Sequence, residues 1–253
     1  MNSNDFFAVN QQLEIFSGGF AYGSSIEKDK YLSFGFYQET DVFIYFPKDF
    51  VILAYEGNAN NINRVFDMSD LNVRGEMLSV FHVGFNKKVN KKFTYGFRGK
   101  IYSSVINFNS VNNNGTFSTV PANTNFYDHI FNLSLQLQTS GATSFLNDEN
   151  SNFSEDVKTL KKRLLFGGNL GLGLDVGFTY QSTDQWTFDL SIQDIGFIRH
   201  SKDVENYELN GNYTFEGINP LFPEVTNGET ANDYWQEISS NFIELFTNNM
   251  CFI

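Results

Sequence analysis

The sequence has one cysteine, few basic residues and no long apolar run. Cys251 alone cannot form an internal disulfide, and it excludes a cysteine-based zinc or iron–sulfur site. The three histidines lie far apart along the chain, so we expect no metal site. No run of about 18 apolar residues is present, which excludes a transmembrane helix. These absences leave a chain without an evident cofactor or metal.

Positive charge is also scarce. Lys and Arg together number 17, Asp and Glu together number 29, and the formal net charge is −12. A chain this acidic would repel a phosphate backbone. We therefore expect no nucleic-acid partner.

The composition that remains favours β-structure. Charged residues make up only 18 % of the 253 residues, whereas aromatic residues make up 17 %. Gly and Asn are abundant, and Pro occurs only 4 times. Such a composition is typical of a β-rich chain with long polar loops and argues against a helical enzyme.

The strongest pattern is alternation of apolar and polar residues in four long segments. These are 92–105, 129–138, 169–180 and 186–197. Each segment would form a strand with one apolar and one polar face. In a soluble sandwich the apolar face packs on a second sheet, and in a membrane barrel it meets lipid. Strands of soluble proteins average about 5–6 residues and barrel strands need about 9–11, so the lengths favour the barrel.

The polar faces of these segments supply the candidate site residues. In a barrel they would line the lumen, where Gly and Ser are common. The lumen-lining candidates are Arg98, Lys100, Tyr102, Asn132, Ser134, Gln136, Asp175, Thr187, Asp189 and Gln193.

Aromatic residues gather beside two short turns, 86–92 and 181–185. Aromatic side chains on the apolar face beside a turn are typical of the girdle at a membrane interface. Ordinary cross-strand pairing in a hairpin is the alternative. The girdle candidates are Phe85, Phe93, Tyr95, Tyr180, Trp186 and Phe188.

The remaining segments give weaker signals. Less regular alternation predicts strands over 12–20, 30–37 and 75–85, and Pro47 precedes a short helix over 48–55. Apolar residues recur at helical spacing over 231–247, which predicts one amphipathic C-terminal helix. Long polar connections are expected at 56–73, 107–126, 139–162 and 199–230, and such connections are typical of one side of a barrel. Within the last connection, alternation over 207–216 predicts a hairpin.

One inconsistency follows from these assignments. If every segment crosses the membrane once, turns 86–92 and 181–185 fall on opposite sides, although short turns normally share one side. A further strand at 115–120 or 163–168 would restore the count, and so would a segment that does not cross.

Three blocks of sequence resemble a known family. They are PKDFVILAYEGNA at 47–59, LSVFHVGFNKKVNKKFTYGFRGKIY at 78–102 and GGNLGLGLDVGFTYQSTDQWTFDLSIQDIGFI at 167–198. Together they resemble a family of unknown function among outer-membrane β-barrels of Bacteroidota. That family is similar to the PorV-like and PorP/SprF-like barrels and, more remotely, to long-chain fatty-acid transporter barrels. The resemblance covers roughly 40–216.

The resemblance implies an outer-membrane location and a signal peptide, which this sequence does not begin with. We therefore expect residues 1–253 to be a single, incomplete antiparallel transmembrane β-barrel domain with long loops. Its function would be transport or a part in a cell-surface secretion or motility complex. The implied partners are outer-membrane lipid, proteins of such a complex and a small hydrophobic solute. The alternative is a soluble, secreted β-sandwich that binds a surface ligand through Asn-rich loops.

We find no pattern that predicts an enzyme. His82 and His129 have Ser and Asn nearby, but no Gly-x-Ser-x-Gly turn is present, and both are expected to be wall or loop residues. Asp175, Asp189 and Asp194 could supply an acid–base pair of carboxylates, or they could bind a cation. The favoured interpretation is lumen polarity, with Arg98 and Lys100 supplying the opposite charge.

Overall fold

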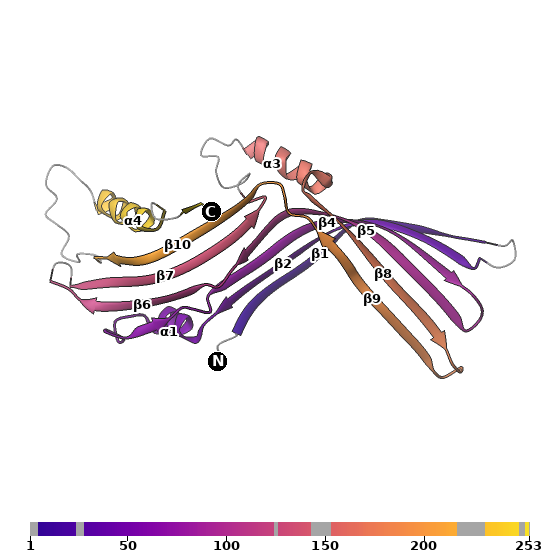
Figure 1. The fold of residues 1–253 in the computed structure, drawn as a ribbon, viewed down its shortest axis with the longest axis horizontal. Helices are drawn as coiled ribbons and strands as arrows, with labels where there is room; N and C mark the ends of the chain where they lie inside the picture. Colours follow the sequence, from indigo (N-terminus) through magenta and orange to yellow (C-terminus); the bar gives the residue numbers. More distant parts are fainter. Residues whose placement is uncertain are drawn as a thin grey trace.

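A computed structural model of the chain describes residues 5–23, 28–123, 126–142, 153–216, 231–247 and 251–252. Most of these residues form strands of one curled, antiparallel sheet (Figure 1), which confirms the expected all-β fold class. The described strands lie in this one sheet, whereas a sandwich would need two packed sheets. No helix within the described ranges is long and apolar enough to span a membrane.

Long strands alternate with a few short helices along the chain. The strands are β1 (Asp5–Tyr22), β2 (Lys30–Phe46), β3 (Val65–Asp67), β4 (Asn72–Lys88), β5 (Phe93–Ser110), β6 (Asn114–Pro121), β7 (Tyr127–Ser140), β8 (Asn169–Gln181), β9 (Thr187–Ile198), β10 (Val204–Phe215) and β11 (Cys251–Phe252). The helices are α1 (Lys48–Glu56), α3 (Phe153–Lys162) and α4 (Ala231–Thr247), and a π-helical turn at Arg163–Gly167 follows α3 directly.

The sheet forks at β5. Strands β1, β2, β4 and β5 pair in that order along their whole length. Beyond β5, residues 93–104 pair with β8, whereas residues 107–110 pair with β7. The first branch continues from β8 to β9, and the second continues from β7 to β10 and β6. Figure 1 shows the two branches leaving β5 in different directions.

Buried polar side chains hold the fork together. At Val105 the pairing of β5 with β4 shifts register, and the Arg163 guanidinium donates to the Val105 carbonyl at 3.1 Å. Asn169, at the start of β8, donates from Nδ2 to Ser140 Oγ at the end of β7 at 2.7 Å. Its Oδ1 accepts from the backbone amides of Ser201 and Lys202 at 2.8 Å each. Since Asn169 is almost fully buried, these bonds satisfy a polar group that water cannot reach.

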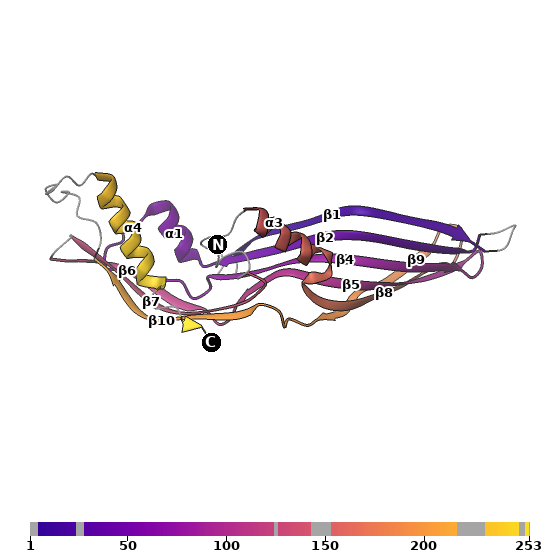
Figure 2. The ribbon, with the colours of Figure 1, turned by 90° about the horizontal axis from the view of Figure 1, so that it is seen from above.

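The fork divides the molecule into two parts with different packing. The helical lobe consists of α1, β3, β6, β7, β10 and α4 (Figure 2). Its core contains Phe66, Met68 and Phe117, against which Ile52 and Leu53 of α1 pack. The centroid of the Phe242 ring, on α4, lies 5.3 Å from that of Phe215 and 6.3 Å from that of Phe131. The lobe is therefore built around aromatic contacts between its strands and helices.

The six-stranded half consists of β8, β9 and the ends of β1, β2, β4 and β5 that lie beside the turns. Its outer face carries exposed apolar side chains from every one of its strands. They include Phe16, Phe20, Phe34, Val83, Phe97, Ile101, Leu172, Leu174, Phe178, Leu190, Ile192, Ile195 and Phe197. Its inner face carries polar side chains and a small cluster of Tyr37, Val80 and Tyr102. The apolar face of this half is thus turned outward and is not covered by the described helices, apart from the turn after α3.

The structure confirms most of the expected elements and extends the strands. The strands predicted at 12–20, 30–37 and 75–85 are β1, β2 and β4, each longer than expected. The helices predicted at 48–55 and 231–247 are α1 and α4. The strand considered at 115–120 is β6.

Three expectations are corrected. Residues 163–168 contain the π-helical turn rather than a strand, because Phe166 takes a positive φ of 65°. Residues 207–216 belong to the single strand β10, which pairs with β7 throughout, and form no hairpin. The connection at 139–162 contains α3, which the polar composition of that stretch concealed. The remainder of the 199–230 connection lies largely outside the described residues.

The inconsistency about the two turns is resolved by the fork. Segment 129–138, which belongs to β7, lies in the helical lobe and does not run alongside β8. The chain returns from the lobe through α3, so β8 runs back beside β5. As a result, the β4–β5 and β8–β9 turns lie at the same end of the six-stranded half (Figure 1).

Candidate functional site

The inner face of the six-stranded half carries a network of charged side chains. Lys100 on β5 is central to it. Its Nζ lies 3.0 Å from Asp175 Oδ2 on β8 and 2.6 Å from Asp194 Oδ1 on β9. Only 4 % of the Lys100 side chain is exposed, against 61 % for Asp194. A cation this buried needs both carboxylates to offset its lost hydration.

A bulge in β9 brings Asp194 into this network. The register of β8 and β9 shifts between Leu174 and Val176, so Asp175 faces two residues of β9 rather than one. Asp194 takes a positive φ of 58°, a conformation that Asp tolerates better than most residues. Its backbone amide donates to Asp175 Oδ1 at 2.8 Å. Asp175 therefore holds both the bulge and the lysine.

Tyr102 completes the network because the facing strand offers a glycine. The Tyr102 hydroxyl donates to Asp194 Oδ1 at 2.8 Å. A Cβ atom added at Gly173 would lie 2.3 Å from the Tyr102 hydroxyl oxygen, so the ring has room only because residue 173 is glycine. This close approach gives a physical reason for one glycine of the alternating Gly-rich segment.

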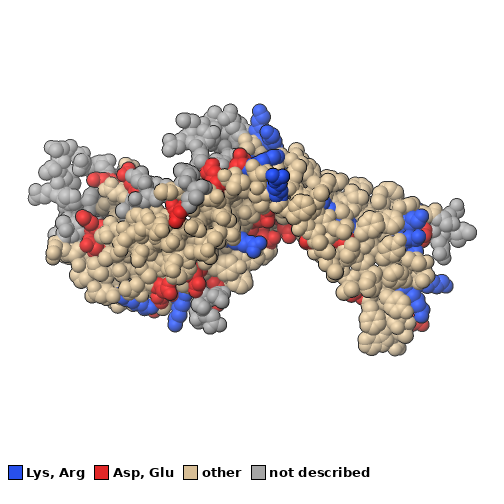
Figure 3. All heavy atoms as spheres, in the orientation of Figure 1, with Lys and Arg blue, Asp and Glu red and all other residues tan. Residues whose placement is uncertain are grey.

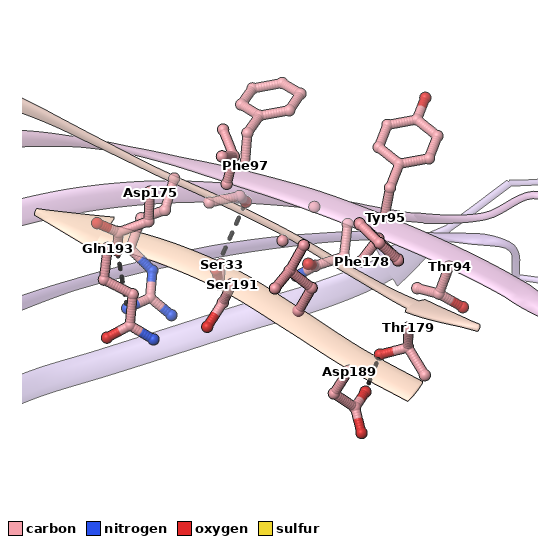
Figure 4. A pocket seen from close by; sticks show the side chains of 17 residues that line it. Ser33, Thr94, Tyr95, Phe97, Asp175, Phe178, Thr179, Asp189, Ser191 and Gln193 are labelled. Atoms are coloured by element: carbon pink, nitrogen blue, oxygen red, sulfur yellow. Dashed lines mark hydrogen bonds and ion pairs between the residues drawn. The ribbon is translucent and has the colours of Figure 1, made fainter. Parts of the chain in front are cut away.

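Next to the network lies a hollow of about 310 Å³ on the inner face. In Figure 4, Ser33, Ser191 and Gln193 lie on one side of the sheet, and Phe97 and Tyr95 point away on the other. Arg98 lines this hollow, with Nη1 3.8 Å from Asp175 Oδ2 and 46 % of its side chain exposed. Its guanidinium is therefore partly exposed to the hollow.

A second hollow of about 620 Å³ extends along the same face toward β1 and β2. Its lining adds Glu14, Glu39, Tyr37 and His82 to the polar residues of the inner face. The sequence did not single out Glu14, Glu39 or Tyr37, because alternation in β1 and β2 is irregular. Acidic side chains gather under the arch of the sheet in the middle of the molecule (Figure 3).

The structure places the predicted lumen residues in two groups. Arg98, Lys100 and Tyr102 of β5 share the inner face with Asp175 of β8. Asp189 and Gln193 line the first hollow, and the pairing of β8 with β9 puts Thr187 on the same face. The other group, Asn132, Ser134 and Gln136, lies on β7 in the helical lobe, away from both hollows.

The predicted aromatic girdle lies at one end of the six-stranded half. Phe85, Phe93 and Tyr95 flank the β4–β5 turn, and Tyr180, Trp186 and Phe188 flank the β8–β9 turn. Phe93 is paired with Tyr180 across the strands. Trp186 and Phe188 are 64 % and 55 % exposed, so they do not belong to a hydrophobic core.

The opposite charges of the network compensate one another. Both Asp175 and Asp194 bind the Lys100 ammonium, so neither is presented as a free acid or base. His82 lies over Gly35 on the inner face, and among the described residues its Nδ1 has no hydrogen-bond partner. Within the same residues, no group of three or more His, Cys, Asp or Glu side chains could hold a metal ion.

Comparison with known proteins assigns the family. Residues 1–250 match the model of a family of unknown function, DUF5723. The chain belongs to this family. No curated protein and no solved structure matches the chain. The match covers nearly the whole length of this DUF5723 chain. The family has no assigned activity.

Proposed function

We propose that this chain forms part of the wall of an integral outer-membrane β-barrel with a polar, solute-conducting lumen. The observation that carries the proposal is the contrast between the two faces of the six-stranded half. The outer face is apolar and exposed on all six strands, and the inner face is polar and charged. Soluble monomers rarely expose an apolar patch larger than about 300–600 Å².

Strand length supports the same proposal. Strands β8 and β9 are 13 and 12 residues long, and their outward side chains are apolar from Leu170 to Tyr180 and from Phe188 to Phe197. A tilted barrel strand needs about 9–11 residues to cross the hydrocarbon layer. The four longer strands would cross with their turn-side ends and continue into the helical lobe outside the membrane.

The two ends of the apolar band support an orientation. Girdle aromatics lie at the turn end, together with Lys87, Lys88, Lys91 and Lys92 of the β4–β5 turn. Such aromatics and lysines suit a membrane interface. Barrels carry short turns on the periplasmic side and long connections outside. The turn end is thus periplasmic, and the helical lobe faces the cell exterior.

The inner face favours a polar solute. The two hollows are lined by carboxylates, amides and hydroxyls, with Arg98 and Lys100 as the basic residues. This lining suits a polar or cationic solute better than the small hydrophobic solute expected from the resemblance. We assign no catalytic step, because the paired carboxylates are occupied by Lys100.

A part in a secretion or motility complex is the second candidate. The resemblance to PorV-like and PorP/SprF-like barrels suggests it, and the helical lobe would supply surface outside the membrane for partner proteins. This role predicts stable co-purification of the barrel with a larger assembly.

Two measurements on the full-length gene product test the proposal. The protein should stay in outer membranes washed with carbonate and should run faster on an SDS gel before heating than after it. Release into the wash without a mobility shift would contradict the barrel.

In planar bilayers, the purified protein should conduct, and Asp175→Asn should lower its preference for cations over anions. The matched control Leu190→Ile on the outer face should change neither conductance nor selectivity. A native protein that does not conduct would contradict a conducting lumen and leave the complex-forming role. Selectivity that is unchanged in Asp175→Asn would contradict a conduction path past Asp175.

A further inference from the structure

A third hollow, of about 240 Å³, lies on the outer face of the sheet beneath the turn after α3. Ile15 and Phe36 of the sheet and Leu164 and Leu165 of the π-helical turn are its apolar lining residues. Almost all of the lining surface is apolar. The hollow is open on one side, and it continues the exposed apolar face of the six-stranded half.

Three polar residues, Gln38, Ser79 and Lys161, also line this hollow. Ser79 on β4 is fully buried beneath the turn, and its Oγ has no hydrogen-bond partner among the described residues. A buried hydroxyl without a partner is unfavourable and rare in folded proteins. Lys161, in the last turn of α3, also lines the hollow. The accessible wall of the hollow is therefore mainly apolar, with the cationic Lys161 beside it and the Ser79 hydroxyl shielded beneath it.

The turn is fixed to the sheet and does not act as a loose flap. The Arg163 guanidinium reaches through to the Val105 carbonyl, and the Arg163 carbonyl accepts from Ser103 Oγ at 2.9 Å. Arg163 also forms an ion pair with Asp203. Phe166 packs on Phe36 with ring centroids 6.1 Å apart. These contacts keep the shape of the hollow.

Basic side chains gather where the turn meets the surface. Lys158, Lys161 and Lys162 lie within the last five residues of α3, in a chain with a net charge of −12 (Figure 3). Beside them, Leu165 is 69 % exposed and Phe166 is 36 % exposed. Exposed apolar residues next to lysines are the pattern of a segment that lies at the surface of a bilayer.

We propose that this hollow binds one acyl chain of a lipid whose headgroup is net negative and whose phosphate pairs with Lys161. The inference rests on the proposed membrane location. It adds a specific lipid site at the boundary between the barrel and the helical lobe. The shared chemistry is an acyl chain below a phosphate, which phosphatidylglycerol and lipid A both offer. Charge complementarity with Lys161 selects such lipids over zwitterionic ones.

Spin-labelled lipids in bilayers containing the full-length protein test the site. We expect the relative association constant to be about fivefold higher for spin-labelled phosphatidylglycerol than for phosphatidylcholine, the size expected for one cationic contact near the surface. Lys161→Gln should abolish this preference. The matched control Lys92→Gln, at the opposite end of the apolar band, should preserve it. A spin-labelled lipid A arm separates the two lipid sources.

The outcomes separate the two proposals. A preference that survives Lys161→Gln, or equal immobilisation of all the lipids by the native protein, overturns the lipid site while leaving the barrel intact. Failure of the protein to insert into bilayers would instead overturn the proposed function.

Discussion

At the scale of single residues, Lys100 is the most constrained group of the inner face. Its ammonium binds two carboxylates and is almost inaccessible to water. One carboxylate comes from β8, which pairs with β5, and the other comes from β9, which pairs with β8. Lys100 therefore links β5, β8 and β9. Loss of this one side chain leaves two negative charges close together, with only Arg98, 3.8 Å from Asp175 Oδ2, to offset them.

We predict that Lys100→Ala lowers the free energy of unfolding by about 3 kcal/mol, the lower end for loss of one partner of a buried pair, because Asp194 keeps access to water. Lys92→Ala at the exposed turn should cost less than about 0.5 kcal/mol. Urea titration of the folded protein in lipid vesicles measures both. Equal stability of the two variants would show that the network is not a structural element.

His129 lies in the helical lobe, outside the segments proposed to cross the membrane. Its Nδ1 lies 3.1 Å from Thr119 Oγ1, and its ring stacks between Phe117 and Phe215. Burial lowers the pKa of His129 below its ordinary value of 6.5, and Asp128 offsets part of this effect. The unfolded chain thus binds the proton more readily than the folded one. Stability associated with His129 is complete above pH 6.5 and is lost as the pH falls through the lowered pKa.

This linkage predicts a melting temperature that falls between about pH 7 and pH 5. His129→Gln should remove part of the pH dependence, and His200→Gln, which alters a partly exposed histidine near Glu76, is the matched control. Melting of the detergent-solubilised protein at several pH values measures the effect. A His129→Gln protein with the same pH dependence as the native one would contradict it.

At the scale of elements, the turn that follows α3 determines where the sheet divides. Arg163 joins this turn to Val105 at the register shift of β5 and to Asp203 after β9. Three segments far apart in the sequence therefore meet on one side chain. The fork depends on this contact as much as on strand pairing.

We predict that Arg163→Met destabilises the protein by about 3–5 kcal/mol, because it leaves a carbonyl and a carboxylate without their partner. Asp203→Asn should cost less, since it keeps a hydrogen-bond acceptor for Arg163. Hydrogen exchange should show the loss of protection first at the start of β8 and the end of β7. Protection that falls evenly over all strands would contradict a local role at the fork.

Alternation and composition predicted the strands well but not their arrangement. Strong period-2 patterns in β8 and β9 correspond to strands with one apolar and one polar face, as the sequence indicated. The pattern in β7 is equally regular, yet its apolar residues lie half-buried in a lobe, because local periodicity does not say what covers a face. The π-helical turn was missed since a single positive φ at Phe166 has no sequence signature.

The candidate site was predictable in part for similar reasons. Polar residues of β5, β8 and β9 were found from their alternation, including Lys100, Asp175 and Asp189. The joint binding of Lys100 by Asp175 and Asp194 depends on a bulge, which shifts the register by one residue and could not be read from spacing. Glu14 and Glu39 reach the same face through long-range pairing, which the sequence alone does not specify.

At the scale of the whole molecule, the proposed barrel depends on the two faces of the six-stranded half. One face would meet lipid, and the other would meet water in a lumen. A charged, water-soluble maleimide distinguishes these environments, because it reaches a cysteine in a lumen but not one facing the hydrocarbon layer. The exposed native cysteine must first be removed with Cys251→Ser.

The decisive measurement compares neighbouring positions of β9 in intact outer membranes. We predict that Ser191→Cys and Asp189→Cys react rapidly with the charged maleimide, whereas Leu190→Cys and Ile192→Cys react only after detergent is added. Such alternation along one strand would establish that the apolar face meets lipid. Equal and rapid labelling at all four positions without detergent would contradict the membrane barrel.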